Sequence, residues 1–120
     1  PTFLALWFIE CKGCINELPY INVLKEKFHA DINFIALTFN GRKELKKFLK
    51  TNHFDLIHLS DTKLVDSMGD FAYPRIFLLD KQQRIKWSTS GIVESEAYGY
   101  QLILNILLKE GKFERFYLSD

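Results

Sequence analysis

The chain opens with an unbroken apolar run, and the apolar positions that follow it change to a helical period. Residues 3–9 have the length and composition of a central strand that is covered on both faces. A second apolar segment, residues 31–40, predicts a neighbouring strand. Helical spacing relates the apolar positions between these two segments, which are Ile15, Leu18, Ile21, Leu24 and Phe28. The first third of the chain therefore predicts a strand, a helix and a second strand.

The middle of the chain predicts a second helix and a short edge strand. Asn40 and Gly41 end the second strand, and Asn40 is placed to cap a helix over residues 42–51. Residues 54–59 contain enough apolar positions for a short edge strand. A single helical turn is expected from Asp61 or Thr62 through Met68.

The last third predicts a β-hairpin and a final helix. Residues 75–80 are strongly apolar, residues 81–83 fit a hairpin loop, and residues 84–90 alternate as a returning strand. A helical pattern then runs from about residue 95 to residue 111. A parallel first part followed by an antiparallel hairpin predicts an α/β fold, a mixed central sheet flanked by helices on both faces.

Composition supports one globular unit and excludes several classes of protein. The 120 residues fit a single domain, 1–120, with 48% hydrophobic residues. A net charge of +1 lacks the strong basic excess that is typical of proteins that bind nucleic acids. The basic cluster within residues 42–50 is expected to be a solvated helix face. No apolar run reaches the roughly 18 residues of a membrane span. Because the chain opens at Pro1, directly before a strand, we expect an excised domain that lacks an N-terminal segment.

The cysteine count favours a working dithiol. Cys11 and Cys14 are the only cysteines, which is too few for a disulfide scaffold. A structural zinc site needs four ligands, and the three histidines, expected at the surface, do not cluster at ligand spacing. We therefore predict no metal and no cofactor.

The position of the cysteine pair predicts its chemistry. The thiolate is the attacking species in disulfide exchange, and a free thiol, with a pKa of about 8.5, is mostly protonated at neutral pH. Cys11 lies where a strand passes into a helix, so backbone N–H groups and the helix dipole favour its thiolate. Cys14, one helical turn further, is placed to resolve the mixed disulfide that Cys11 forms.

The residues around the pair carry a family resemblance. Residues 7–19, WFIECKGCINELP, resemble the active-site stretch of thioredoxin-like proteins, and within them the TlpA/ResA group of thiol-disulfide oxidoreductases. Trp7 precedes Cys11 by four residues, and Glu17 and Pro19 match the group's C-x-x-E-x-P pattern. Tyr73 and Pro74 precede a strand where the family has its cis-proline. The resemblance implies a thioredoxin-like fold over essentially the whole chain, and an enzyme that exchanges disulfides.

The resemblance also implies roles for individual residues. Cys11 and Cys14 are expected to be catalytic, with Glu17 carrying the proton of Cys14; spacing alone favours a solvated helix residue at Glu17 over this role. A substrate groove is expected at Trp7, Tyr73 and Pro74, with a core position as the alternative for Trp7. The expected partners are protein thiol or disulfide substrates and an upstream thiol reductant.

Departures from the family pattern leave other functions open. Glu10 stands where an aromatic is usual, and Lys12 and Gly13 replace the commoner pair that has Pro second. The main alternative is a non-catalytic thioredoxin-fold module that binds a partner. A peroxidase is a weaker alternative, because Phe8 occupies the position where a T-x-x-C peroxidase has Thr. The expected location is the periplasm or cell envelope, with the cytoplasm as the alternative.

Overall fold

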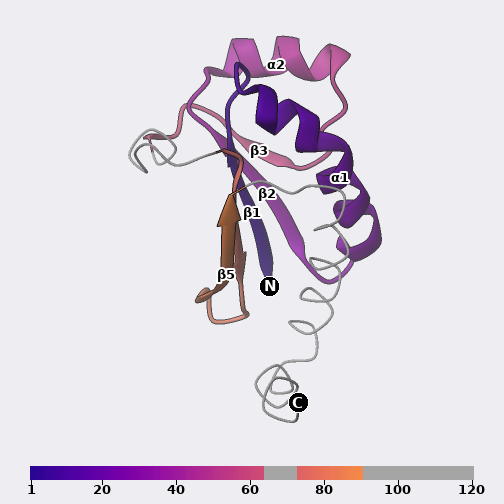
Figure 1. Ribbon diagram of the computed structural model, residues 1–120, viewed down its shortest axis with the longest axis vertical. Helices are drawn as coiled ribbons and strands as arrows, with labels where there is room; N and C mark the ends of the chain where they lie inside the picture. The colour runs from indigo at the N-terminus through magenta and orange to yellow at the C-terminus, as the bar shows by residue number, and fades with distance from the viewer. Residues whose placement is uncertain (64–72, 91–120) are drawn as a thin grey trace.

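A mixed sheet organises the chain. The computed structural model describes residues 1–63 and 73–90, and within them five strands lie in the order β3-β2-β1-β4-β5 (Figure 1). The elements are β1 (Thr2–Trp7), α1 (Lys12–Phe28), β2 (Asn33–Thr38), α2 (Arg42–Thr51), β3 (Ile57–Leu59), β4 (Arg75–Leu79) and β5 (Ile85–Ser90). Strands β1, β2 and β3 are parallel, whereas β4 runs antiparallel to both β1 and β5. The predicted mixed sheet is confirmed; the expected turn through Met68 and the final helix lie outside the described residues.

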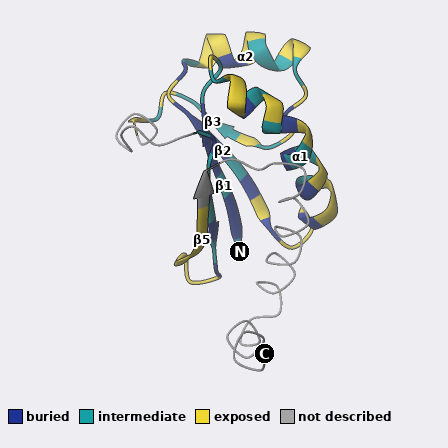
Figure 2. Ribbon diagram, in the orientation of Figure 1, coloured by how far each residue is buried: buried dark blue, intermediate teal, exposed yellow. Residues whose placement is uncertain are grey.

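Strand β1 is central because its sequence leaves no polar face. It pairs with β2 on one side and β4 on the other, so its backbone is hydrogen-bonded along both edges. Phe3, Ala5 and Trp7 enter one buried cluster, and Leu6 enters a second cluster with Leu37. Alternate residues point to opposite faces, so β1 has apolar side chains on both. Figure 2 shows this buried interior in dark blue, with exposed residues on the outer faces of both helices.

Both described helices pack on the same face of the sheet. Helix α1 buries one side along its whole length, and α2 adds Leu45 to the same cluster. The residues of α1 in this cluster are Cys14, Leu18, Ile21, Leu24 and Phe28. Each such apolar side chain contributes about 1.5–3 kcal/mol when it is fully buried. The basic cluster of α2 is exposed, which confirms it as a solvated face. A helix layer on the other face stays a prediction.

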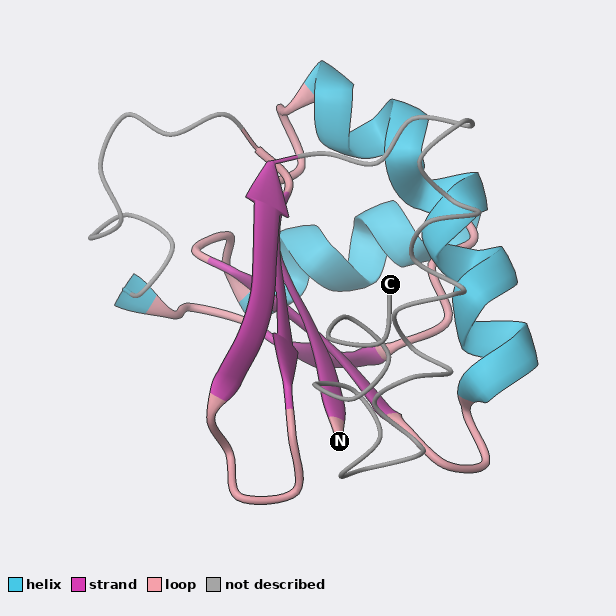
Figure 3. Cartoon of the chain, turned by 60° about the horizontal axis from the view of Figure 1, so that its bottom comes forward, coloured by secondary structure: helices cyan, strands magenta, loops and turns pink. Residues whose placement is uncertain are grey.

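Strands β4 and β5 form a hairpin (Figure 3), and Asp80 at the end of β4 holds its loop. The Asp80 carboxylate accepts from the backbone N–H groups of Gln82 and Arg84 at 2.9 and 3.0 Å. Gln83 has a φ of 65°, in the left-handed region where a hairpin glycine is usual. Asp80 therefore supplies the loop hydrogen bonds that hold this turn in the absence of glycine.

The carboxyl ends of β1 and β2 bring two strand–helix connections side by side. Trp7 and Thr38, the last residues of the two strands, are register partners. Residues 8–11, the first junction, lead from β1 into α1, and residues 39–41, the second junction, lead from β2 into α2. Since β1 and β2 are parallel, both helices begin at one edge of the sheet. The cysteine pair lies at this edge.

Candidate active site

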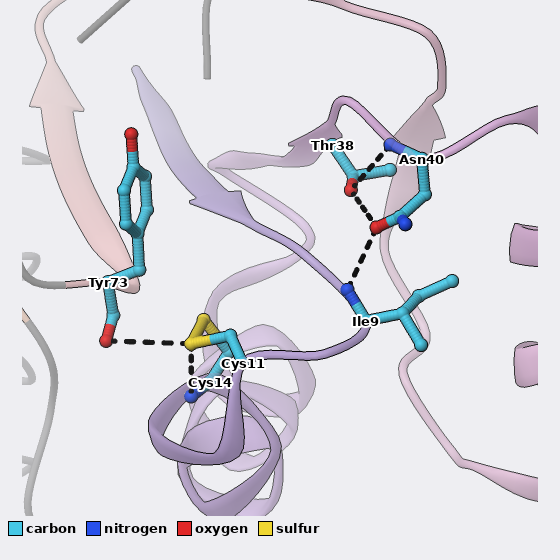
Figure 4. The surroundings of a disulfide bond; sticks show 6 residues. All are labelled: Ile9, Cys11, Cys14, Thr38, Asn40 and Tyr73. Atoms are coloured by element: carbon cyan, nitrogen blue, oxygen red, sulfur yellow. Dashed lines mark hydrogen bonds between the residues drawn. A yellow bond between two sulfur atoms is a disulfide. The ribbon is translucent and has the colours of Figure 1, made fainter. Parts of the chain in front are cut away.

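Cys11 caps the N-terminus of α1. Its backbone is extended, with φ −85° and ψ 102°, and its sulfur accepts from the Cys14 backbone N–H at 3.1 Å. The two sulfurs are joined as a disulfide, across a Cα–Cα distance of 5.2 Å (Figure 4). The N–H group that bonds the sulfur is one of those that a helix leaves unpaired in its first turn. A thiolate at Cys11 would therefore meet a fixed donor and the positive end of the helix dipole.

The two cysteines differ in accessibility. Cys14 is 0% exposed and belongs to the core cluster, whereas Cys11 is half-buried and packs only against its edge. A substrate sulfur can therefore reach Cys11 but not Cys14. This asymmetry fits Cys11 as the attacking residue and Cys14 as the resolving residue.

The Tyr73 carbonyl, in the segment just before β4, faces the cysteine pair. Its oxygen lies 3.8 Å from the Cys11 sulfur, and a Cβ added at Gly13 would lie 3.3 Å from the same oxygen. The disulfide sulfur has no proton to donate, so this contact becomes a hydrogen bond only when Cys11 is a reduced thiol. The Tyr73–Pro74 peptide bond is cis. Because Gly13 has no side chain, the backbone before β4 can approach the start of α1 closely.

Asn40 bonds to the first junction instead of capping α2. Its side-chain oxygen accepts from the Ile9 backbone N–H at 2.8 Å, and its amide nitrogen donates to the Glu10 carboxylate at 2.9 Å. The N-cap of α2 is Gly41, which makes no side-chain cap hydrogen bond. The prediction that Asn40 caps this helix is therefore wrong. Asn40 makes two hydrogen bonds to the neighbouring turn, whereas capping α2 would give it only one. The larger number of hydrogen bonds favours the observed arrangement.

Glu10 and Lys12, which flank the nucleophile, are both exposed. The carboxylate of Glu10 is nevertheless engaged by Asn40, whose amide nitrogen also donates to Glu44 at 3.3 Å. One amide group therefore joins two carboxylates that would otherwise repel each other. Nothing in the sequence spacing pointed to this contact, because Glu10 and Asn40 are 30 residues apart.

Glu17 lies on α1, three residues beyond Cys14 and on the same side of the helix. The residue is half-buried, and its Oε2 atom is shielded from solvent. A partly buried carboxylate at this position matches what a proton carrier for Cys14 would need. The role itself stays a prediction.

Trp7 lies in the core, which is the alternative position expected for it. Its side chain is 1% exposed, and its ring packs on Phe48 and Phe54 with centroid distances of 5.4 and 5.1 Å. A side chain enclosed in this way cannot line an open groove. Its position at the last residue of β1 makes Trp7 an anchor beneath the first junction.

Pro74 is also fully buried, so its ring cannot contact a substrate. Of the three predicted groove residues, only Tyr73 is partly accessible. Two aromatic residues that were not among the predicted groove residues extend from it. Phe8 meets the Tyr73 ring edge-on at 5.5 Å and stacks on Phe39 at 5.3 Å, and Phe39 is 43% exposed. These two rings, one from each junction, form the apolar surface beside Tyr73.

His58 is half-buried, so the expectation that all three histidines lie at the surface is wrong for this residue. Its ring packs against Phe54 and Trp7, and its Nε2 lies 2.7 Å from the Phe54 carbonyl oxygen. Because a carbonyl only accepts, Nε2 carries the hydrogen. Burial lowers the pKa of His58 below its usual 6.5, and the Phe54 carbonyl and the Asp55 charge oppose that effect. His29 and His53 are exposed.

Within residues 1–63 and 73–90, no three His, Cys, Asp or Glu side chains are grouped as a metal ion would require. In the same residues, neither helix has the length and apolar character that crossing a bilayer demands.

Comparison with known proteins gives a consistent picture. The model of the Redoxin family matches residues 1–102. The thiol-disulfide oxidoreductase ResA of Bacillus cereus is 30% identical over 88 residues, which is 70% of this chain and 51% of the relative. The chain thus spans about half the length of this curated relative.

Solved structures share the fold. The candidate thiol:disulfide interchange protein DsbE of Chlorobium tepidum superposes with a TM-score of 0.78 at 19% identity, covering 89% of this chain and 79% of that one. StoA of Bacillus subtilis gives a TM-score of 0.66 at 21% identity, covering 81% and 78%. These similarities show a thioredoxin-like fold, and together with the ResA match they confirm the resemblance to the TlpA/ResA group.

Proposed function

Because this chain belongs to the Redoxin family, we propose that it is a thiol–disulfide oxidoreductase that exchanges disulfides with protein substrates through Cys11 and Cys14. The observation that carries the proposal is the half-buried Cys11 sulfur, held by a helix N–H and bonded to a fully buried partner. A structural disulfide has no need of an accessible sulfur at a helix N-terminus. A catalytic pair needs one accessible and one protected sulfur.

The reaction moves two electrons from the dithiol to a substrate disulfide. The Cys11 thiolate attacks one substrate sulfur, and the other leaves as a thiolate and takes up a proton. The Cys14 thiol then loses its proton and attacks the Cys11 sulfur, which releases the second substrate thiolate. The product is the Cys11–Cys14 disulfide, the state in the structure. An upstream thiol reductant, which is a further proposed partner, returns the pair to the dithiol.

Glu17 is the proposed proton acceptor for Cys14. Cys14 is fully buried, so water cannot readily remove its proton, whereas Glu17 lies one helical turn away with one shielded oxygen. Glu17→Gln should slow the resolution step on the order of 10²-fold and flatten its pH dependence. Glu26→Gln, which changes an exposed glutamate on the same helix, is the control. Equal rates for both variants in rapid-mixing experiments would exclude this role.

The proposed substrate surface consists of the Tyr73 backbone and the rings of Phe8 and Phe39. An extended substrate segment beside Cys11 would pair with the Tyr73 backbone as an added strand. The exposed Phe39 ring supplies apolar contact next to the segment. A preference for substrates with apolar residues near the target disulfide is expected.

The direct test is reduction of insulin disulfides with dithiothreitol as electron donor. The wild type should accelerate the reaction, and Cys11→Ser should reduce the rate to that of dithiothreitol alone. Cys14→Ser should accumulate a mixed disulfide through Cys11, which electrophoresis without reductant would detect. Asn22→Ala, which changes an asparagine that bonds to the loop before β3, controls for folding. Activity unaffected by Cys11→Ser, or absent from the wild type, would instead favour the non-catalytic module.

We also propose an extracytoplasmic location, on the similarity to the TlpA/ResA group. Exchange of protein disulfides suits an oxidising compartment, where such bonds persist. Fractionation of cells that express the full-length gene product would test this. Recovery in the cytoplasm with a reduced Cys11–Cys14 pair would contradict it.

A further inference from the structure

The Asn40 side chain is almost completely enclosed, and its hydrogen bonds go to two junctions. Asn40 is 4% exposed, and its oxygen accepts from the Ile9 N–H and the Thr38 hydroxyl, both at 2.8 Å (Figure 4). Its nitrogen donates to Glu10 at 2.9 and 3.3 Å and to Glu44 at 3.3 Å. Every polar atom of this amide therefore has a partner.

These bonds reach both central residues of the turn that presents Cys11. The Cys11 N–H donates to the Phe8 carbonyl at 3.2 Å, which closes a four-residue turn. Ile9 and Glu10 are the two central residues of that turn. Asn40 holds the first by its backbone N–H and the second by its carboxylate. The conformation of the turn is thus fixed from the neighbouring strand end.

We propose that Asn40 is a positioning residue for disulfide exchange: it clamps the turn 8–11 so that the Cys11 sulfur stays at the helix N-terminus when the disulfide is open. The inference rests on the proposed function. In the oxidised protein the bond to Cys14 holds the Cys11 sulfur in place. In the reduced protein that bond is absent, and the position of the sulfur depends on the backbone of the turn and on the weaker contacts with the Cys14 N–H and the Tyr73 carbonyl. The clamp therefore matters most in the state that attacks substrate.

A loss of the clamp should weaken the thiolate in two ways. The Cys11 sulfur would spend less time within reach of the Cys14 N–H, which bonds it at 3.1 Å in the structure. Glu10 is the residue next to Cys11. Once its carboxylate is released from the Asn40 amide, its negative charge would be free to approach the Cys11 sulfur and would disfavour the thiolate. Both effects favour the protonated thiol.

The experiment measures alkylation of Cys11 by iodoacetamide across a range of pH, in reduced protein that carries Cys14→Ser. Adding Asn40→Ala should slow alkylation roughly 3- to 10-fold at about pH 6, because the hydrogen bond to the thiolate is weakened and not wholly lost. At about pH 10 every Cys11 thiol is ionised, and the rates should converge. A merely structural loss would not give this dependence on pH.

Asn22→Ala is the matched control. Asn22 also joins two segments through its side chain, donating to the His53 carbonyl at 2.8 Å and accepting from the Asp55 N–H at 3.2 Å. Its loss should lower stability, as the loss of Asn40 does, but should leave the alkylation profile unchanged. Equal profiles for Asn40→Ala and Asn22→Ala would overturn the proposal.

A second pair of variants keeps the test informative if Asn40→Ala folds poorly. Asn40→Asp keeps an acceptor for Ile9 but sets a third carboxylate against Glu10 and Glu44, so alkylation near pH 6 should slow. Combining it with Glu10→Gln restores a donor opposite residue 40 and should recover at least half of the lost rate. No recovery would contradict the clamp. Because alkylation needs no substrate protein, a failed insulin assay and a failed clamp are separate outcomes.

Discussion

The two strand–helix junctions begin alike and end differently. Each follows a parallel strand, and their last strand residues, Trp7 and Thr38, are register partners. At the first junction the Cys11 sulfur caps α1, whereas at the second Gly41 begins α2 with no side-chain cap. The asparagine that would cap α2 bonds instead to the turn before Cys11. The second junction thus supports the first at the expense of its own helix.

The difference shows where a redox loop obtains its stability. A reactive sulfur at a helix N-terminus needs backbone N–H groups that are left free to bond it. Those N–H groups therefore cannot also hold the turn in place through local hydrogen bonds. The restraint must come from outside the turn, and here it comes from a buried side chain on the adjacent junction. The core supports the first junction from below through Trp7.

The largest expected effect is from Trp7→Ala, which removes that core support. The indole packs on Phe48, Phe54 and His58, so truncation should cost about 3–5 kcal/mol in the free energy of unfolding. Urea denaturation measures the loss. If Trp7 also anchors the first junction, the protein that remains folded should lose disulfide exchange activity.

Trp7→Phe is the control for this comparison. It keeps an aromatic ring in the cluster and should cost far less than the alanine substitution. If Trp7 acts only in the core, Trp7→Phe should leave the Michaelis constant for insulin at the wild-type value. A large rise in that constant without loss of stability would return Trp7 to the substrate surface.

Much of this edge of the sheet was predictable from the sequence. Apolar patterns, together with the turn residues Asn40 and Gly41 before α2, predicted every described strand and helix. Burial imposes such patterns on β1, β2, β4 and α1. The cysteine pair at the end of β1 predicted an accessible Cys11 at a helix N-terminus. These features depend on neighbours in sequence, and the structure differs only in where elements end; β2, for example, covers Asn33–Thr38 within the predicted 31–40.

The contacts between junctions were not predictable in the same way. Asn40 carries the local signal of a helix cap, and the competing partners, Ile9 and Glu10, are about 30 residues away. Trp7 has an aromatic side chain that suits a core or a groove equally well. His58 lies between Ile57 and Leu59, which are both exposed, yet its own ring packs against the rings of Trp7 and Phe54. Each of these outcomes depends on packing between segments, which local patterns do not determine.

A smaller effect should follow from pH, through His58 beneath the first junction. Burial lowers the pKa of His58 in the folded protein, so the unfolded chain binds its proton more readily. Neutral His58 therefore makes its full contribution to the free energy of unfolding above about pH 6.5, the pKa of histidine in the unfolded chain. That contribution is lost as the pH falls through the lower pKa of His58 in the folded protein. Urea midpoints should fall between about pH 7 and pH 5 by more in the wild type than in His58→Phe.

His53→Phe serves as the control for the pH experiment, because His53 is exposed. Its pH dependence should follow that of the wild type. If His58→Phe and the wild type lost stability in parallel, protonation of His58 would have no part in the support of Trp7.

The smallest expected effect is a gain, from giving the second junction the cap that it lacks. Gly41 has φ −71° and ψ 160°, which suit serine, and an added Cβ would lie 3.7 Å from Asp61 and 3.9 Å from Glu44. Gly41→Ser also creates the S-x-x-E pattern of a capping box with Glu44. The free energy of unfolding should rise by about 0.5–1 kcal/mol.

Gly41→Ala separates the cap from the loss of backbone freedom. Alanine fits the same space but offers no oxygen to the helix N–H groups, so it should give less stability than serine. Neither variant alters the bond from Asn40 to Ile9, and Cys11 alkylation should follow the wild-type profile in both. If Gly41→Ser stabilised the protein and also changed the reactivity of Cys11, the two junctions would be coupled through α2 itself, and the clamp would not act through Asn40 alone.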